Sequence, residues 1–189
     1  QEIIRRYFDA LNALAKGSTS EKEAQKIELL MNMAGITVTD RKVVIKALER
    51  AKETDGPAAA LELRDGRIIT GKTTNLLGAS AALLLNVLKV LAGIDHETHI
   101  ISPESIEPIQ KLKVDYLKSK NPRLHTDEVL IALSASAATN PQARLALSQL
   151  PELAGCQAHT SVMLSDVDIK IFKKLEVQLT SEAVYEHAL

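Results

Sequence analysis

The sequence predicts an α/β protein: a three-layer α/β/α sandwich with a mixed sheet, preceded by a small helical subdomain. Three observations indicate this class. Leu76–Leu91 is apolar on nearly all sides, which is typical of a helix enclosed in a core. Before it, two hydrophobic runs separated by an Asp-Gly pair have the pattern of a β-hairpin. After it, short strands alternate with helices, as in α/β folds.

Three amphipathic helices are predicted at the start of the chain. Apolar residues recur at helical spacing over residues 3–14, 27–34 and 43–48. Glycines at 17, 35 and 56 follow the three stretches and are expected to end them. We therefore expect residues 1–55 to form a helical subdomain whose role is packing, and residues 56–189 to form the sandwich domain.

The hairpin and the enclosed helix are expected to be joined by threonines. The hairpin is predicted over residues 58–70, with Asp65-Gly66 as its turn. Thr73 or Thr74 is then expected to cap the helix. The small residues over 78–82 would allow a neighbouring backbone to approach the helix closely.

The remainder of the chain is predicted to alternate between strands and helices. Short strands are expected at residues 99–101, 158–164 and 177–179. Each helix has a residue before it that is suited to be its N-cap: Ser102 or Ser105, Thr126, Asn140 and Ser165.

Composition limits the classes of protein that this chain can represent. The 23 basic and 24 acidic residues are interspersed, and without a basic face a nucleic-acid binder is not expected. One cysteine, Cys156, excludes an internal disulfide and fits a cytoplasmic protein. Asn86 and Lys89 interrupt the apolar run, so no membrane span is expected. The chain opens on Gln1 without a signal-like leader, so we expect it to be part of a longer protein.

Gly66–Thr73 matches the P-loop expression G-x-x-x-x-G-K-[ST] letter for letter. A P-loop needs a loop between its two glycines, whereas Ile68-Ile69-Thr70 favours a strand. We therefore interpret this stretch as the second half of the hairpin. A weaker alternative stays open, in which Lys72 and Thr73 help to bind an anion at the N-terminus of the enclosed helix.

No metal site is predicted. Cys156 with His159, and His96 with His99, have suggestive spacings, but residues three apart on a strand point to opposite faces. The zinc-deaminase signature H-x-E with P-C-x-x-C is missing. A site could form only if the fold brought His125, His159 and Cys156 together. No cofactor can be named from the sequence.

The loop at residues 121–128, NPRLHTDE, carries the densest set of reactive side chains. Arg123 could bind a phosphate or a carboxylate, and His125 could transfer a proton near neutral pH. The alternative is structural: Arg123 would pair with a surface acid while Thr126 caps the helix that follows.

Five blocks of the sequence resemble a known family: QEIIRRYFDAL, TGKTTNLLGASAALLLN, HIISPESIEPIQKLK, NPRLHTDEVLIALSASAATNP and GCQAHTSVMLSDVD. Together they are similar to the C-terminal portion of an uncharacterised bacterial family, domain of unknown function number eighteen-forty-six. The resemblance implies a helical piece beside an α/β/α sandwich loosely similar to the cytidine-deaminase topology. It also implies a preceding region with a P-loop-like phosphate-binding stretch, and it implies no activity.

Two hypotheses follow for function. In the first, the domain binds a small anionic or phosphorylated ligand together with the preceding region. Its site would lie where strands lead into helices, with Lys72, Thr73, Ser102 and Arg123 as ligand-binding residues and His125 and His159 as catalytic ones. In the second, the leading helices and the alanine-rich faces build a homo-oligomer, and the chemistry lies elsewhere in the protein.

Overall fold

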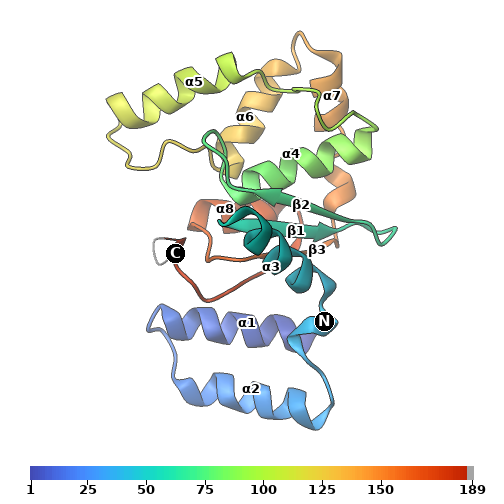
Figure 1. The fold of residues 1–189 in the computed structure, drawn as a ribbon, viewed down its shortest axis with the longest axis vertical. Helices are drawn as coiled ribbons and strands as arrows, with labels where there is room; N and C mark the ends of the chain where they lie inside the picture. Colours follow the sequence, from blue (N-terminus) through green and yellow to red (C-terminus); the bar gives the residue numbers. More distant parts are fainter. Residues whose placement is uncertain (187–189) are drawn as a thin grey trace.

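A four-stranded mixed sheet is the framework of the computed structural model, which describes residues 1–186 (Figure 1). The strands are β1 (Ala58–Glu62), β2 (Ile68–Lys72), β3 (Gln157–Thr160) and β4 (Gln178–Ser181). Their order in the sheet is β2-β1-β3-β4. β1 is antiparallel to both of its neighbours, whereas β3 and β4 are parallel. Hence β2, β3 and β4 run in the same direction, and the predicted mixed sheet is confirmed.

Helices flank this sheet and precede it. They are α1 (Glu2–Ala15), α2 (Glu21–Met33), α3 (Lys42–Thr54), α4 (Ala79–Ala92), α5 (Pro103–Lys111), α6 (Thr126–Ser136), α7 (Pro141–Leu147) and α8 (Asp166–Lys174). A π-helical turn, Leu112–Tyr116, extends α5, and short 3-10 turns lie at Val38–Asp40 and Leu150–Leu153. Within residues 1–186, no helix combines the length and apolar character needed to cross a membrane.

The Asp-Gly hairpin is confirmed. The N–H of Leu63 donates to the carbonyl of Arg67 at 2.8 Å, and Gly66 in the turn has a φ of +85°, which favours glycine. Successive residues of β1 face opposite sides of the sheet. Leu61 joins the core around α4, whereas Ala60 packs with Val43 and Ala47 of α3. Helices therefore cover both faces of β1.

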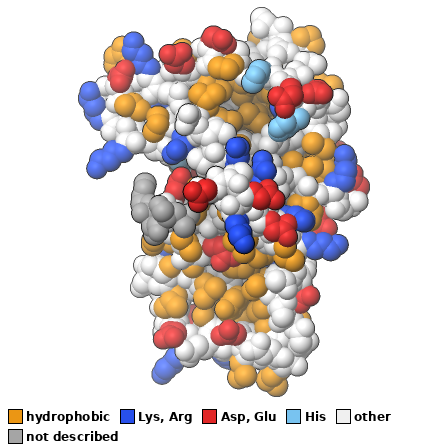
Figure 2. All heavy atoms as spheres, in the orientation of Figure 1, with side chains coloured by type: hydrophobic (Ala, Val, Ile, Leu, Met, Phe, Trp, Pro, Cys, Tyr) orange, Lys and Arg blue, Asp and Glu red, His pale blue; other side chains and the backbone are white. Residues whose placement is uncertain are grey.

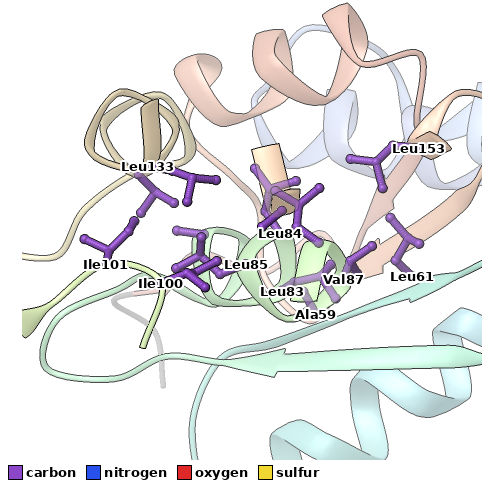
Figure 3. Packing of buried hydrophobic residues seen from close by; sticks show 14 of the residues in the cluster. Ala59, Leu61, Leu83, Leu84, Leu85, Val87, Ile100, Ile101, Leu133 and Leu153 are labelled. Carbon is purple, nitrogen blue, oxygen red and sulfur yellow. The ribbon is translucent and has the colours of Figure 1, made fainter. Parts of the chain in front are cut away.

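The enclosed helix is also confirmed, as α4. Its residues from Ala79 to Leu88 are buried except for Asn86, and Leu83, Leu84 and Leu85 fill the core that Figure 3 shows. The expected close approach involves Gly71 of β2. A Cβ at that position would lie 2.3 Å from the backbone nitrogen of Leu83, so only glycine allows β2 and α4 to pack at this distance.

The predicted caps of α4 and α6 are wrong. α4 begins after Gly78, because the chain first makes a turn in which the hydroxyl of Thr74 accepts from the N–H groups of Leu76 and Leu77. The N-cap of α6 is His125, and Thr126 is its first helical residue. The hydroxyl of Thr126 instead donates a hydrogen bond to the carboxylate of Asp168.

Three other N-cap predictions agree with the structure. Asn140 and Ser165 accept hydrogen bonds from backbone N–H groups at the starts of α7 and α8. Ser102 precedes α5, although its hydroxyl lies 2.9 Å from the hydroxyl of Ser105 rather than bonding to the backbone.

The strand predicted at 99–101 is wrong. Ile100 and Ile101 lie in a bend, where they are 3% and 5% exposed and belong to the core. A short apolar run marks burial as readily as it marks a strand. The later strands exist but have different limits from those predicted, since β3 ends at Thr160 and β4 begins at Gln178.

The first three helices have different neighbours. α1 and α2 pack on each other through a cluster that includes Phe8 and Met31. α3 packs against the sheet, and Figure 1 shows it between the strands and the α1–α2 pair. The division of the chain at residue 56 into two domains stays a prediction.

Candidate functional site

A cleft of about 930 Å³ lies at the edge of the sheet where β2 ends and β1 begins. We call it the edge cleft. Its walls are the C-terminal end of α3, the residue after β2 and the loop at 120–123. The lining residues are Ala51, Lys52, Asp55, Gly56, Pro57, Thr73, Lys120, Asn121, Pro122, Arg123 and Glu186. In open α/β sheets, ligands bind preferentially beyond the carboxyl ends of the strands, and β2 ends at this cleft.

Charged side chains of both signs line the edge cleft. Lys52, Lys120 and Arg123 line it, and among the described residues none of them has a carboxylate oxygen within 4.0 Å. Two acids, Asp55 and Glu186, also line the cleft. The cleft thus combines three cations with two carboxylates, and none of these cations is neutralised by direct contact.

The loop that carries Arg123 is held in place by backbone contacts. The N–H of Leu124 donates to the carbonyl of Leu76 at 2.9 Å, and the N–H of Gly78 donates to the carbonyl of Leu124 at 3.2 Å. Leu124 is completely buried. Arg123 lines the edge cleft, whereas His125 is not among the residues that line it.

Arg123 keeps donors available. Its Nε donates to the carbonyl of Thr74 at 2.7 Å, and its own N–H donates to the side chain of Asn121 at 3.0 Å. Both terminal guanidinium nitrogens remain without a hydrogen-bond partner among residues 1–186. These are the atoms that bind a carboxylate or phosphate in a forked geometry.

Thr73 forms the floor of the edge cleft. Its N–H donates to the carbonyl of Pro57 at 2.9 Å, which extends the pairing of the hairpin by one residue. Its Oγ1 is covered and has no hydrogen-bond partner in the described part of the chain. A buried hydroxyl without a partner is unfavourable, so this group is available to form a hydrogen bond with a bound molecule.

His125 forms a hydrogen-bonded pair with Asp168 of α8. The His125 Nδ1 lies 3.2 Å from Asp168 Oδ2. The other carboxylate oxygen of Asp168 accepts from the backbone N–H of Thr126 at 2.9 Å and from its hydroxyl at 2.6 Å. The side chain of Asp168 is 7% exposed and that of His125 is 32% exposed. The acid is therefore fixed, and the imidazole remains reachable.

The two pKa values in this pair move in opposite directions. The hydrogen bond to Asp168 raises the pKa of His125, against the opposing effect of burial. Burial alone would raise the pKa of Asp168, but the hydrogen bonds from His125 and Thr126 together lower it. Because the carboxylate accepts from Nδ1–H, Nε2 is left to exchange a proton with a ligand.

Lys72 and Ser102 do not reach the edge cleft. Lys72 is exposed at the end of β2 and lines a separate hollow beside α4. Ser102 lines a smaller hollow of about 420 Å³ between the start of α5 and α6. The structure thus brings Thr73 and Arg123 together and places the other two predicted ligand-binding residues elsewhere.

His159 lies inside the protein with 0% exposure. Its Nδ1 is 2.8 Å from the hydroxyl of Thr180, and its Nε2 is 3.2 Å from a carboxylate oxygen of Glu182. The centroid of its ring lies 4.8 Å from that of Phe8, with the two ring planes inclined by 53°. Burial is the largest influence on it and lowers the pKa of its imidazole. Its predicted catalytic role stays a prediction.

Arg41 is a buried residue whose importance the sequence did not indicate. It is 1% exposed, and burial lowers its pKa to about 10. Its five N–H groups donate to the side chains of Gln1, Gln157 and Thr180 and to the backbone carbonyls of Ala158 and Gln178. These partners connect α1, the start of α3, β3 and β4. An arginine just before a helix carries no pattern that would predict this network.

The residues considered for a metal have separate partners. His125 bonds to Asp168, His159 to Thr180 and Glu182, and the Sγ of Cys156 lies 3.7 Å from the carbonyl of Glu152. Burial raises the pKa of the Cys156 thiol. Within residues 1–186, no three His, Cys, Asp or Glu side chains are grouped closely enough to hold a metal ion.

The fold and this site define a class: an α/β domain with a mixed four-stranded sheet and a cationic cleft at its carboxyl edge. The chain belongs to the family described as Domain of unknown function DUF1846, C-terminal, whose model matches residues 39–189. The resemblance that the five blocks of sequence indicated is therefore confirmed.

Relatives of the chain are bacterial proteins named UPF0371 protein. One from Corynebacterium aurimucosum is 57% identical over 185 residues, which is 98% of this chain and 37% of the relative. Another, from Streptococcus pyogenes serotype M5, is 47% identical over 187 residues, which is 99% of this chain and 38% of the relative. The chain thus spans well under half of the length of these relatives, as expected for part of a longer protein.

Proposed function

We propose that this domain binds a small phosphorylated or carboxylated metabolite in the edge cleft, and that it does so together with the part of the longer protein that this chain does not include. In this proposal the sheet and its helices form a three-layer sandwich, loosely like the cytidine-deaminase topology, with the ligand at the carboxyl edge. The observation that carries it is the set of cations without carboxylate partners, Lys52, Lys120 and Arg123.

Each lining group has a role in the proposal. The two free guanidinium nitrogens of Arg123 would hold the anion in a forked contact, with the two lysines as further charges. Asp55 and Glu186 accept hydrogen bonds from hydroxyl groups. The mixed lining therefore suits a phosphorylated sugar or polyol better than an ion without hydroxyls.

His125 would supply proton transfer in this proposal. It follows Arg123 by two residues in the sequence and lies outside the lining of the edge cleft. Its Nδ1 is held by Asp168 while the imidazole stays partly exposed. Lys72, Ser102 and the enclosed His159 lie away from the cleft and have no part in this arrangement.

The test is calorimetric titration of the complete protein with inorganic phosphate and with glucose 6-phosphate. Arg123→Met should weaken binding of the sugar phosphate about tenfold or more, because a hydrogen bond to a charged group contributes about 1.5–3 kcal/mol. Lys26→Met, on the exposed side of α2, is the matched control and should leave the affinity unchanged. Equal affinities in wild type and Arg123→Met would contradict the proposal.

A second candidate function, assembly, is favoured by the outer face of α2. Leu29, Leu30 and Met33 on this helix are 60%, 48% and 77% exposed, and Figure 2 shows hydrophobic side chains over the α1–α2 end. By contrast, the small residues Ala79 and Ala81 of α4 are buried and cannot form a contact between copies. Light scattering of the complete protein and of Met33→Lys tests this alternative. A monomer at high concentration would rule it out.

A further inference from the structure

A second hollow, of about 630 Å³, lies between the free edge of β2, helix α4 and the segment 96–106. We call it the α4 hollow. Its apolar wall includes Leu76, Leu77, Leu85, Ile100, Ile101 and Ile106. Figure 2 shows hydrophobic side chains gathered beside two histidines on this part of the surface, and Figure 3 shows Ile100 next to Leu85. Its size and apolar lining are those of a site for a small molecule.

Lys89 connects α4 to the segment 96–106 on the other side of the α4 hollow. The Lys89 ammonium donates to the backbone carbonyls of His96 and Thr98, which belong to the segment that faces β2. Gly93, which follows the last residue of α4, is in the left-handed conformation, so the chain turns back along the helix at this point. These contacts hold the wall in place before any ligand arrives.

The free edge of β2 supplies the polar end of the hollow. The N–H of Thr73 bonds to Pro57, so by the alternation of an antiparallel ladder the backbone groups of Lys72 and Thr70 face away from β1. The carbonyl of Thr70 is taken by the side chain of Asn86 at 3.0 Å. The N–H and the ammonium of Lys72 remain as donors at this end.

The charges around the α4 hollow favour an anion at Lys72. Arg50 is paired with Glu53, and the ammonium of Lys89 is occupied by carbonyls. Lys72 has no carboxylate oxygen within 4.0 Å in the described chain. Glu97 is the one acid among the described residues that line the hollow, on the wall formed by the segment 96–106.

We propose that the α4 hollow is a binding site for a small molecule with an apolar body and one carboxylate or other anionic group. The apolar body lies against Leu85, Ile100 and Ile106, and the anionic group lies at Lys72. This site is separate from the edge cleft, and neither proposal depends on the other.

Octanoate, with its neutral analogue octanamide, is the probe for this proposal. Calorimetric titration of the complete protein should show octanoate binding that inorganic phosphate does not displace. Lys72→Met should weaken octanoate three- to fivefold and leave octanamide unchanged, since an exposed charge contributes up to about 1 kcal/mol. Lys26→Met is the matched control for removing a positive charge.

A second variant fills the hollow. Ala82 lines it from α4, so Ala82→Met should place a side chain in the space and weaken octanoate more than tenfold. Nuclear Overhauser contacts between octanoate methylenes and isoleucine methyl groups provide a reading that does not depend on this variant's folding. Equal binding of octanoate and octanamide in wild type, or the absence of contacts to isoleucine methyls, would overturn the proposal.

Discussion

His125 and His159 each lie 3.2 Å from a carboxylate oxygen, yet their pKa values shift in opposite directions. In the first pair the acid is buried, with Asp168 7% and His125 32% exposed, and the contact with the carboxylate dominates and raises the pKa. In the second the imidazole is buried, with His159 0% and Glu182 26% exposed, and burial dominates and lowers the pKa. The direction of the pKa shift of each histidine therefore depends on whether the acid or the imidazole is the buried partner.

The comparison separates a reachable polar site from an enclosed one. The imidazole of His125 is 32% exposed, so a ligand can reach it. His159 belongs to a buried network with Thr180 and Arg41, in which every donor is occupied. The first arrangement has the features of a functional site, and the second connects the N-terminal helices to the sheet.

The largest expected effect comes from breaking the enclosed network at Arg41. Arg41→Met should lower the free energy of unfolding by about 3–5 kcal/mol, because several buried acceptors lose their donor at once. Urea denaturation measures the change. Arg6→Met, which removes an exposed ion pair with Glu2, is the control and should cost less than about 1 kcal/mol. A similar small loss for Arg41→Met would show that the network contributes little.

The next effect is a loss of stability in acid that depends on His159. Because its folded pKa lies below the usual 6.5, the unfolded chain takes up a proton first as the pH falls. The contribution of His159 to the free energy of unfolding is fully present above pH 6.5. Below that pH it decreases, by at most about 1.4 kcal/mol per pH unit. His159→Gln should remove this dependence in urea denaturation between pH 7.5 and 5.5. An unchanged slope would show that the pKa of this imidazole is the same in the folded and unfolded states.

The stability contribution of His125 should depend on pH in the opposite direction. The pKa of its imidazole is raised in the folded state. Its contribution to the free energy of unfolding is therefore fully present below pH 6.5 and is lost as the pH rises through that raised pKa. An NMR titration of the imidazole should find its pKa above that of a model histidine. Asp168→Asn should bring it down, while Asp166→Asn, a neighbour outside the pair, should not. No change in Asp168→Asn would show that the pair has no influence.

The last prediction concerns the support of Asp168. Thr126→Val removes the hydroxyl that donates to the carboxylate at 2.6 Å and should cost about 1–2 kcal/mol. It should also raise the pKa of Asp168, whose stabilising contribution is present above pH 3.8 and lost as the pH falls through its folded pKa. Acid unfolding should therefore begin at a higher pH than in wild type. Ser136→Val, on the same helix, is the comparison variant.

Much of the fold was predictable from local patterns. The Asp-Gly turn, the enclosed α4 and the caps at Asn140 and Ser165 were found because each depends on a few neighbouring residues. The site was predictable only in part. Arg123 and Thr73 do line one cleft, whereas Lys72 and Ser102 face other hollows, because a junction between strand and helix does not specify which side of the loop a side chain takes.

By itself the sequence determined the helices and hairpin, the aliphatic core and the family to which the chain belongs. The tertiary structure alone decided the partners of the buried polar groups. The guanidinium of Arg41 donates to backbone carbonyls of β3 and β4. The imidazole of His125 bonds to Asp168 of α8, which is 43 residues later in the sequence. The physical reason is that apolar burial depends on periodicity along the chain, whereas a hydrogen bond needs two groups placed within about 3 Å of each other, and no local pattern encodes that distance.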